Sequence, residues 1–85
     1  MENLYEVLKS MQIQACLSDS ELERCLEDSG VTFSAYNSWK NGAYVPNQRK
    51  LLCVTNLLVD EAKKYDRDIS EYALLAERMR REKRI

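Results

Sequence analysis

Gly30, Gly42 and Pro46 are the only strong helix breakers in this chain of 85 residues. A β-sheet needs Gly, Pro and similar turn residues between its strands, so their scarcity favours helices. Charged residues make up 32% of the chain, which also suits the exposed faces of helices. A chain of this length buries one hydrophobic core and has no room for a second. We therefore predict a compact all-α domain of four or five short helices.

The first two helices are indicated by apolar spacing and by a capping motif. Residues 2–15 are predicted to be helical, with Asn3 as the N-cap, because apolar residues recur there at helical intervals. These residues are Leu4, Val7, Leu8, Met11 and Ala15. Ser18 and Glu21 have the spacing of a capping box, in which each side chain bonds the backbone N–H of the other. We predict a second helix over about residues 19–28, with Gly30 as the left-handed residue that follows it.

The third helix is predicted to have an apolar side and a polar side. Thr32 is a suitable N-cap, and Gly42 a suitable terminator, for a helix from residue 33 to about residue 41. The apolar side consists of Val31, Ala35, Tyr36 and Trp39, which fall on one face of a helix. The side chains on or near the other face are Phe33, Ser34, Asn37, Ser38, Lys40 and Asn41.

The stretch LLCVTNLLV, residues 51–59, is apolar on nearly every side of a helix and therefore predicts a central one. This helix begins at Pro46 or Asn47, because Pro disfavours helical conformation in the residue before it. It ends between residues 58 and 65. A fifth helix is predicted from Ile69 to about residue 81, with Asp68 and Glu71 as a second capping pair.

Acidic and basic residues are segregated along the chain. Residues 1–30 hold seven acidic side chains against two basic ones, whereas residues 31–59 hold three basic side chains and no acidic one. Residues 60–75 are again acidic, and residues 76–85 carry five basic side chains against two acidic ones. The net charge of −1 argues by itself against nucleic-acid binding, but the basic middle and the basic tail favour it.

Few residues are available for catalysis or metal binding. The chain has no His and no CxxC pair, which excludes a Cys/His zinc site and His-based catalysis. We expect no enzyme activity and no cofactor. Cys16, Cys25 and Cys53 are predicted to be small buried hydrophobic residues in a reducing compartment, with a redox role for one of them as the alternative. No stretch approaches the roughly 18 apolar residues of a membrane span, and the acidic N-terminus is unlike a signal peptide, so we expect a cytoplasmic protein.

The stretches LSDSELERCL, GVTFSAYNSWKNGAYVP and LLCVTNLL, taken together, resemble the helix-turn-helix domain of the phage lambda repressor and Cro family. The resemblance covers about residues 4–60. Glu23 departs from it, because the family usually has a small residue there, and residues 27–30 lengthen the turn. The positions that match the family pattern are Leu22, Val31, Thr32, Tyr36, Trp39, Gly42, Pro46, Leu51 and Leu58.

The resemblance implies a sequence-specific transcriptional regulator of phage or plasmid type, with a DNA-binding domain over residues 1–65. In this family the third helix enters the major groove while the preceding helix crosses the phosphate backbone. The base-contacting residues would then be Thr32, Phe33, Ser34, Asn37 and Ser38. The phosphate-contacting residues would be Lys40, Asn41, Tyr44, Gln48, Arg49 and Lys50. The alternative for Asn37, Ser38, Arg49 and Lys50 is ordinary solvated surface, and for Phe33 it is burial.

Regulators of this family generally bind two-fold sites as dimers, so the resemblance also implies a homodimer bound to double-stranded DNA. The C-terminal amphipathic helix and basic tail, residues 66–85, either form the dimer contact or belong to the same compact unit as the rest. The predicted dimer contact consists of Tyr65, Ile69, Tyr72, Leu75 and Met79. The basic tail is a solvated helix end, a DNA-backbone arm or a contact for the acidic N-terminal region of another subunit.

A second functional class fits the same fold. A protein-interaction module, such as an antitoxin, an anti-repressor or a polymerase-binding modulator, would use the acidic N-terminal region or the fifth helix against a protein partner. The net acidity and the paucity of Arg and Lys on the third helix favour this alternative, whereas the acid-free middle segment opposes it.

Overall fold

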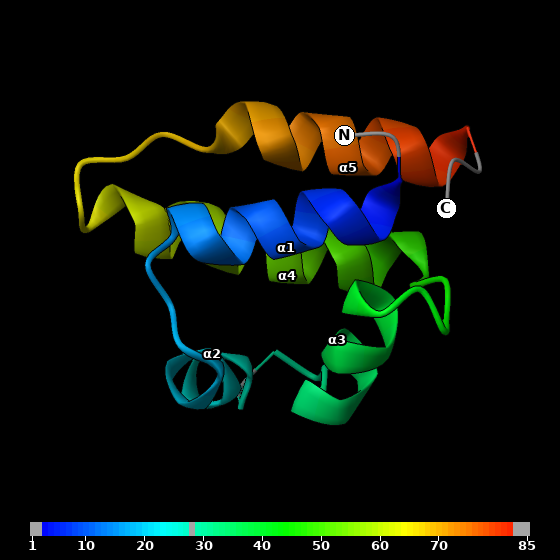
Figure 1. The fold of residues 1–85 in the computed structure, drawn as a ribbon, viewed down its shortest axis with the longest axis horizontal. Helices are drawn as coiled ribbons and strands as arrows, with labels where there is room; N and C mark the ends of the chain where they lie inside the picture. The colour runs from blue at the N-terminus through cyan, green and yellow to red at the C-terminus, as the bar shows by residue number, and fades with distance from the viewer. Residues whose placement is uncertain (1–2, 28, 83–85) are drawn as a thin grey trace.

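The computed structural model describes residues 3–27 and 29–82 of the chain. These residues form five α-helices and no β-strand, which confirms the all-α prediction (Figure 1). None of the helices in these two ranges is both long enough and apolar enough to cross a membrane. The helices are α1 (Leu4–Gln14), α2 (Asp19–Leu26), α3 (Phe33–Lys40), α4 (Gln48–Lys63) and α5 (Ser70–Arg81).

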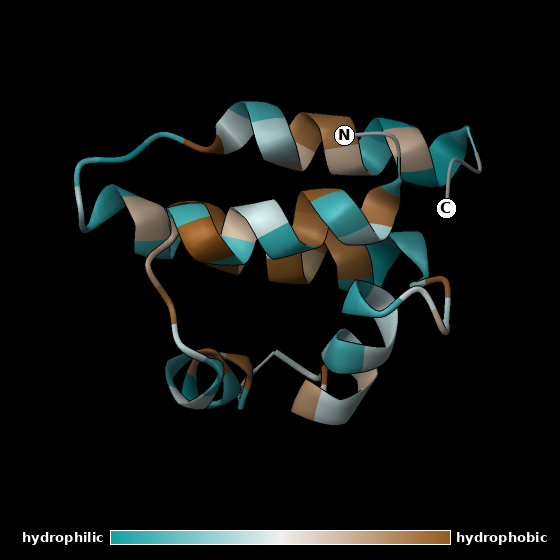
Figure 2. Cartoon of the chain, in the orientation of Figure 1, coloured by the Kyte–Doolittle hydropathy of each residue, from teal (hydrophilic) through white to brown (hydrophobic). Residues whose placement is uncertain are grey.

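The helices are arranged in layers around one core. Helices α1 and α4 lie together in the middle, α5 packs against both of them from one side, and α3 and α2 lie on the other side (Figure 1). Hydrophobic and hydrophilic residues alternate along each helix, as expected for helices with one buried side (Figure 2). Each helix gives the core at least one fully buried side chain, for example Leu8, Leu22, Tyr36, Leu58 and Met79.

Three of the helices begin with a side-chain cap, as their sequences require. Ser18 Oγ accepts a hydrogen bond from the backbone N–H of Glu21, and the Glu21 carboxylate accepts one from the backbone N–H of Ser18. This pair confirms the predicted capping box of α2. Thr32 Oγ1 accepts from the N–H of Ala35 at 3.0 Å, and Asn47 caps α4 in the same way. These bonds satisfy backbone donors that have no partner inside the helix.

The predicted caps of the first and last helices in the chain are wrong. The Asn3 side chain does not cap α1; its amide donates to the Tyr5 hydroxyl at 2.9 Å. Asp68 does not pair with Glu71, because its carboxylate accepts from the backbone N–H and the hydroxyl of Ser70. In both cases the side chain bonds a residue two positions further along the chain instead of making the predicted cap.

Four of the described residues have a left-handed backbone conformation, and each lies at a turn. Gly30 and Gly42 have φ angles of 78° and 75°, as predicted from their positions after a helix. Cys16 and Asp66, both with φ of 59°, take the same role after α1 and α4, although neither is Gly. Cys16 is exposed at this corner, so the prediction that it is a buried residue is wrong.

The connection between α2 and α3 is long, because α2 ends at Leu26 instead of residue 28 and α3 begins at Phe33. Ser29 organises the described part of this connection. Its hydroxyl donates to the Leu26 carbonyl at 2.7 Å and accepts from the N–H of Val31 at 3.1 Å. The Cys53 thiol of α4 donates to the Ser29 carbonyl at 3.5 Å, which ties the turn to the central helix.

Helix α5 packs on the rest of the chain through one side. Ile69 and Met79 are 2% and 0% exposed and lie in the common core, while Tyr72 and Leu75 are half-buried against it. Ile69 and Met79 were predicted to contact a second subunit, and their burial corrects that prediction. The apolar spacing that suggested a dimer contact is used by this chain to cover its own α1 and α4.

Candidate nucleic-acid interface

Helix α3 has a buried side and a solvent-facing side. Tyr36 and Trp39 are almost fully buried, with ring centroids 6.4 Å apart, and Val31 is buried beside them. This confirms the predicted apolar side of the helix. Ser34 and Asn41, which lie roughly half a turn away, are exposed. The polar side of α3 is therefore available to a partner.

A groove of about 550 Å³ runs beside this exposed side. Its walls are residues 30–32, four residues of α3, the loop of residues 44–47 and the first turn of α4. The α3 residues are Ser34 and Ser38 of the polar side and Ala35 and Trp39 of the apolar side. Tyr44 in the 44–47 loop is 70% exposed, and Lys50 brings a positive charge to the α4 side. None of the described residues that line the groove is acidic. The lining residues are Gly30, Val31, Thr32, Ser34, Ala35, Ser38, Trp39, Tyr44, Val45, Pro46, Asn47 and Lys50.

The structure brings five of the predicted DNA-contacting residues together in this groove. They are Thr32, Ser34, Ser38, Tyr44 and Lys50. The Ser38 hydroxyl donates to the Ser34 carbonyl at 3.1 Å, so its oxygen is directed along the helix but still has a lone pair to accept with.

The remaining predicted contacts lie outside the groove lining. Asn41, Gln48 and Arg49 are exposed next to it in sequence, and Asn37 is half-buried. Phe33 is partly buried against the core and lines a different hollow between α2 and α3, which it shares with Glu23 and Glu27. Phe33 is therefore separated from the serine side chains with which it was grouped.

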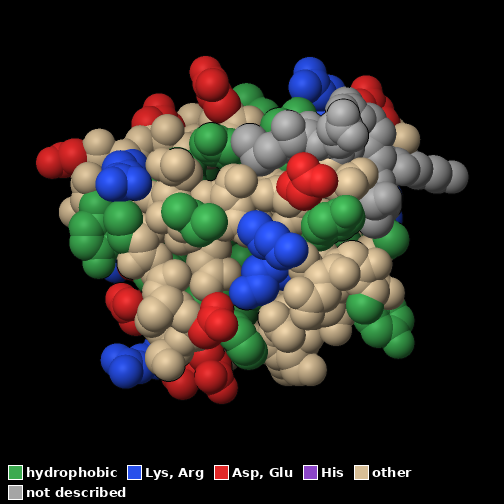
Figure 3. Space-filling model, in the orientation of Figure 1, with side chains coloured by type: hydrophobic (Ala, Val, Ile, Leu, Met, Phe, Trp, Pro, Cys, Tyr) green, Lys and Arg blue, Asp and Glu red, His purple; other side chains and the backbone are tan. Residues whose placement is uncertain are grey.

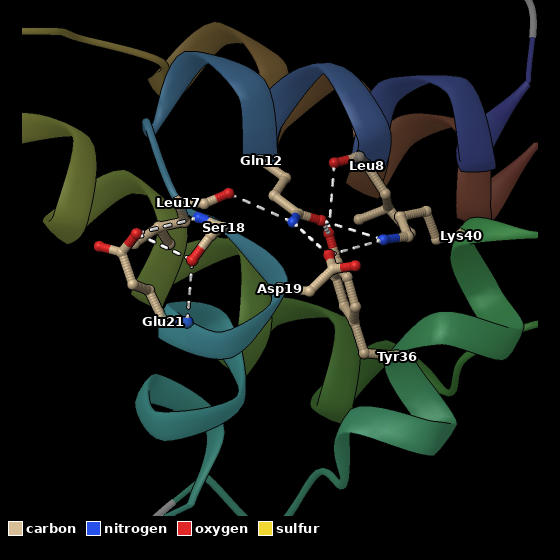
Figure 4. A network of polar contacts seen from close by, with 8 residues as sticks. All are labelled: Leu8, Gln12, Leu17, Ser18, Asp19, Glu21, Tyr36 and Lys40. Atoms are coloured by element: carbon tan, nitrogen blue, oxygen red, sulfur yellow. Dashed lines mark hydrogen bonds and ion pairs between the residues drawn. The ribbon is translucent and has the colours of Figure 1, made fainter.

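Lys40 was predicted to contact phosphate, and its position in the structure opposes that prediction. Its side chain is only 14% exposed and turns towards α1 and α2 (Figure 4). The ammonium donates to Gln12 Oε1 and to Asp19 Oδ1, both at 3.3 Å, and lies 5.6 Å from the centre of the Tyr36 ring. Lys40 is therefore part of an internal polar network, and its charge is neutralised by Asp19.

Gln12 is the centre of this network, which joins three helices. Its amide nitrogen donates to Asp19 Oδ1 at 2.8 Å and to the Leu17 carbonyl at 3.3 Å, and its amide oxygen accepts from the Tyr36 hydroxyl at 3.2 Å (Figure 4). The hydrogen bonds from Gln12 and then Lys40 lower the pKa of the Asp19 carboxyl. Burial raises the pKa of the Tyr36 hydroxyl, and the nearby Asp19 charge adds to that effect. The network fixes α3 against α1 and the start of α2, and so sets the direction of the exposed side of α3.

Helix α5 ends beside the groove. Arg80 Nε donates to the carbonyl of Pro46 at 2.8 Å, and Pro46 belongs to the groove wall. Arg81 is exposed next to it, while Lys83 and Arg84 of the basic tail lie outside the described residues. The sequence separates Arg80 from Pro46 by 34 residues and shows no local signal for this contact.

Helix α2 borders the candidate interface with negative charge. Glu21, Glu23 and Glu27 are exposed on it, and acidic side chains gather over this part of the molecule at the lower left of Figure 3. Carboxylates repel phosphates, so a DNA-binding surface here would be centred on α3, the 44–47 loop and the start of α4.

Comparisons with models of known protein families found no match to the chain. Searches of curated proteins and of solved structures likewise found no significant match.

Proposed function

We propose that this chain is a sequence-specific DNA-binding regulator that presents the exposed side of α3 to the major groove, as its resemblance to the lambda repressor and Cro family implies. The observation that carries the proposal is the acid-free groove formed by α3, the 44–47 loop and the start of α4. Its hydroxyl groups are suited to base edges, and the one basic residue of its lining, Lys50, is suited to phosphates. Such a protein would act in the cytoplasm by occupying an operator.

The start of α4 supports the phosphate-contacting part of the proposal. Asn47 caps the helix, and the first turn carries Arg49 and Lys50 with no acidic residue. Backbone N–H groups at a helix N-terminus attract anions, and the two basic side chains add to that attraction. Tyr44, exposed in the preceding loop, can donate a hydrogen bond from its hydroxyl to a phosphate of the DNA backbone.

A salt titration against random duplex DNA tests the class of partner. Phosphate contacts supply the non-specific part of DNA affinity, so binding measured by fluorescence anisotropy should be detectable at about 50 mM salt and should fall steeply as salt rises. Absence of binding at this salt concentration would rule out the DNA-binding proposal.

Two lysines of α4 provide a matched pair for locating the surface. Lys50 lies at the groove and Lys63 at the opposite end of the same helix, and both are exposed. Lys50→Ala should weaken binding to all duplexes alike and reduce the salt dependence, whereas Lys63→Ala should leave binding unchanged. Asn37→Ala should relax the preference at one base pair. Equal effects of the two lysine variants would show that the wrong surface has been chosen.

A protein-interaction module on the same fold remains the second candidate, and one observation favours it. Lys40 is the only basic residue of α3, and Asp19 and Gln12 hold it inside the network. The exposed side of α3 therefore has no positive charge of its own. A chain of this class would fail the salt titration above, and its acidic α2 would be the first surface to test against an antitoxin target, a repressor or a polymerase subunit.

A further inference from the structure

The loop before α4 is bonded to the last turn of α5. Arg80 Nε donates to the Pro46 carbonyl at 2.8 Å, and Pro46 is buried although the residues on both sides of it are exposed. Helix α5 packs against α4, and its C-terminal end lies at the same end of the molecule as the loop that joins α3 to α4 (Figure 1). The Arg80 bond therefore connects the outer layer of the fold to a wall of the groove.

The Pro46 carbonyl depends on Arg80 because the start of α4 does not provide its usual donor. In a continuous helix this carbonyl would accept from the backbone N–H four residues later, which is that of Lys50. The Lys50 N–H donates instead to Asn47 Oδ1 at 2.8 Å, since Asn47 is the N-cap of the helix. The cap thus leaves a carbonyl of a buried residue outside the helical ladder, and such a group needs another partner. Arg80 is that partner.

The other end of the same loop is fixed by bonds to α3. Gly42 turns the chain with a φ angle of 75°, and the N–H of Ala43 donates to the Ser38 carbonyl at 2.9 Å. Between this turn and Pro46, the side chains of Tyr44 and Val45 are 70% and 50% exposed. The loop therefore presents two exposed side chains from a backbone that is held by α3 at one end and by α5 at the other.

We propose that Arg80 is a positioning residue of the candidate DNA interface, which it serves through its Nε–H hydrogen bond to Pro46. This inference rests on the proposed function. Two of the proposed phosphate contacts, Tyr44 and Lys50, lie on either side of Pro46 in the chain, so a displacement of Pro46 moves one relative to the other. When only a fraction of the molecules has the binding conformation, the apparent affinity falls by that fraction. The bond acts through geometry, and the charge of Arg80 is not required for it.

Two uncharged substitutions separate the hydrogen bond from the charge. The side-chain nitrogen of Gln is attached to Cδ, as Nε of Arg is, so Arg80→Gln keeps an N–H donor at the same distance from the backbone. Arg80→Met has a methyl group at that position and no donor. Both variants lose the same positive charge, so a difference between them reports the bond to Pro46. Arg78, exposed on the same helix, provides the control pair Arg78→Gln and Arg78→Met.

Fluorescence anisotropy with a random-sequence duplex at about 50 mM salt measures the effect on binding. Arg80→Gln should keep the dissociation constant within about twofold of the wild type, whereas Arg80→Met should raise it roughly fivefold. The two Arg78 variants should bind alike. Circular dichroism confirms that each variant is folded at the temperature of the assay. A purely structural role of Arg80 would lower the melting temperature and leave the affinity of the folded protein unchanged.

Backbone ¹⁵N relaxation of the protein without DNA measures the order of the loop directly. The N–H groups of Tyr44 and Val45 should be as ordered in Arg80→Gln as in the wild type and less ordered in Arg80→Met. Affinity should follow this order across the variants. Equal affinities of the Gln and Met variants with different loop order would overturn the proposal, as would a loop that stays equally ordered in all of them.

The two measurements distinguish failure of this inference from failure of the proposed function. Absence of DNA binding by the wild type would refute the proposed function and, with it, the role of Arg80 in DNA binding, while relaxation would still decide whether the bond holds the loop. DNA binding that Arg80→Gln and Arg80→Met weaken equally, with an ordered loop in both, would assign the effect to charge. That result would overturn the positioning role and leave the proposed function intact.

Discussion

The hydrogen bond between Tyr36 and Gln12 gives a quantitative test of the internal network. Tyr36→Phe removes a buried hydroxyl that donates to Gln12 Oε1 at 3.2 Å and lies 3.4 Å from the Leu8 carbonyl. Gln12 Oε1 keeps its bond from Lys40, so the variant leaves this acceptor with a partner. The loss is therefore that of one ordinary hydrogen bond, about 1 kcal/mol of unfolding free energy. For a domain of this size that corresponds to roughly 4–8 °C in melting temperature.

Gln12→Leu should be more destabilising than Tyr36→Phe and should lower the unfolding free energy by about 2 kcal/mol in total. The reason is that it places an apolar side chain against the Tyr36 hydroxyl and the Lys40 ammonium. The double variant Gln12→Leu/Tyr36→Phe should be less destabilised than the sum of the two single variants, by about 1 kcal/mol. Both substitutions remove the same hydrogen bond, which can be lost only once.

Urea unfolding followed by circular dichroism measures all of these free energies. The values can be compared when the variants share the same slope of unfolding free energy against urea concentration. Tyr44→Phe is the matched control, because its hydroxyl is on a side chain that is 70% exposed, and it should change stability by less than about 0.5 kcal/mol. Equal effects of Tyr36→Phe and Tyr44→Phe, or strictly additive effects of the Gln12 and Tyr36 substitutions, would contradict the hydrogen bond between these two side chains.

Three further predictions follow from single residues. The pKa of Asp19 is lowered in the folded state. Its carboxylate therefore contributes stability that is present above the unfolded pKa of about 3.9 and is lost as the pH falls through the folded pKa. Melting temperatures of wild type and Asp19→Asn should differ at pH 7 and converge towards pH 2. Gly42→Ala should lower the melting temperature more than Gly30→Ala: both have positive φ, but only at Gly42 does the new Cβ lie 3.3 Å from the Tyr5 ring, and equal shifts would contradict this. Cys16 should be alkylated before the other two cysteines in the native protein, which mass spectrometry after brief iodoacetamide treatment can measure.

The direction of the Lys40 side chain could not be predicted from the sequence. Lys40 was assigned to the outward side of its helix because helical spacing places it on or near that face. Its actual direction depends on Gln12 and Asp19, which are 28 and 21 residues away in the sequence. A lysine side chain is long enough to turn towards a buried partner from the edge of a helix face, and only the packing of α1 against α3 brings that partner into reach.

The partner of the apolar side of α5 could not be predicted from the sequence either. The stripe that includes Ile69 and Met79 indicated an apolar side in need of a partner, and it was correct that the side is buried. The sequence alone left open whether the cover would be a second chain or this one. The structure places α1 and α4 there, and this leaves Leu74, on the outer side of the helix, as the exposed apolar residue.

The features predicted correctly from the sequence are those whose partners lie only a few residues away. These are the all-α class, the capping box at Ser18, the cap at Thr32 and the inward side of α3 with Tyr36 and Trp39. The packing of whole helices decided that Lys40 lies in an internal polar network, that Arg80 bonds the Pro46 carbonyl and that α1 and α4 cover the apolar side of α5. The physical reason is range: caps and helix periodicity are set within one or two turns, whereas these contacts depend on how complete helices pack.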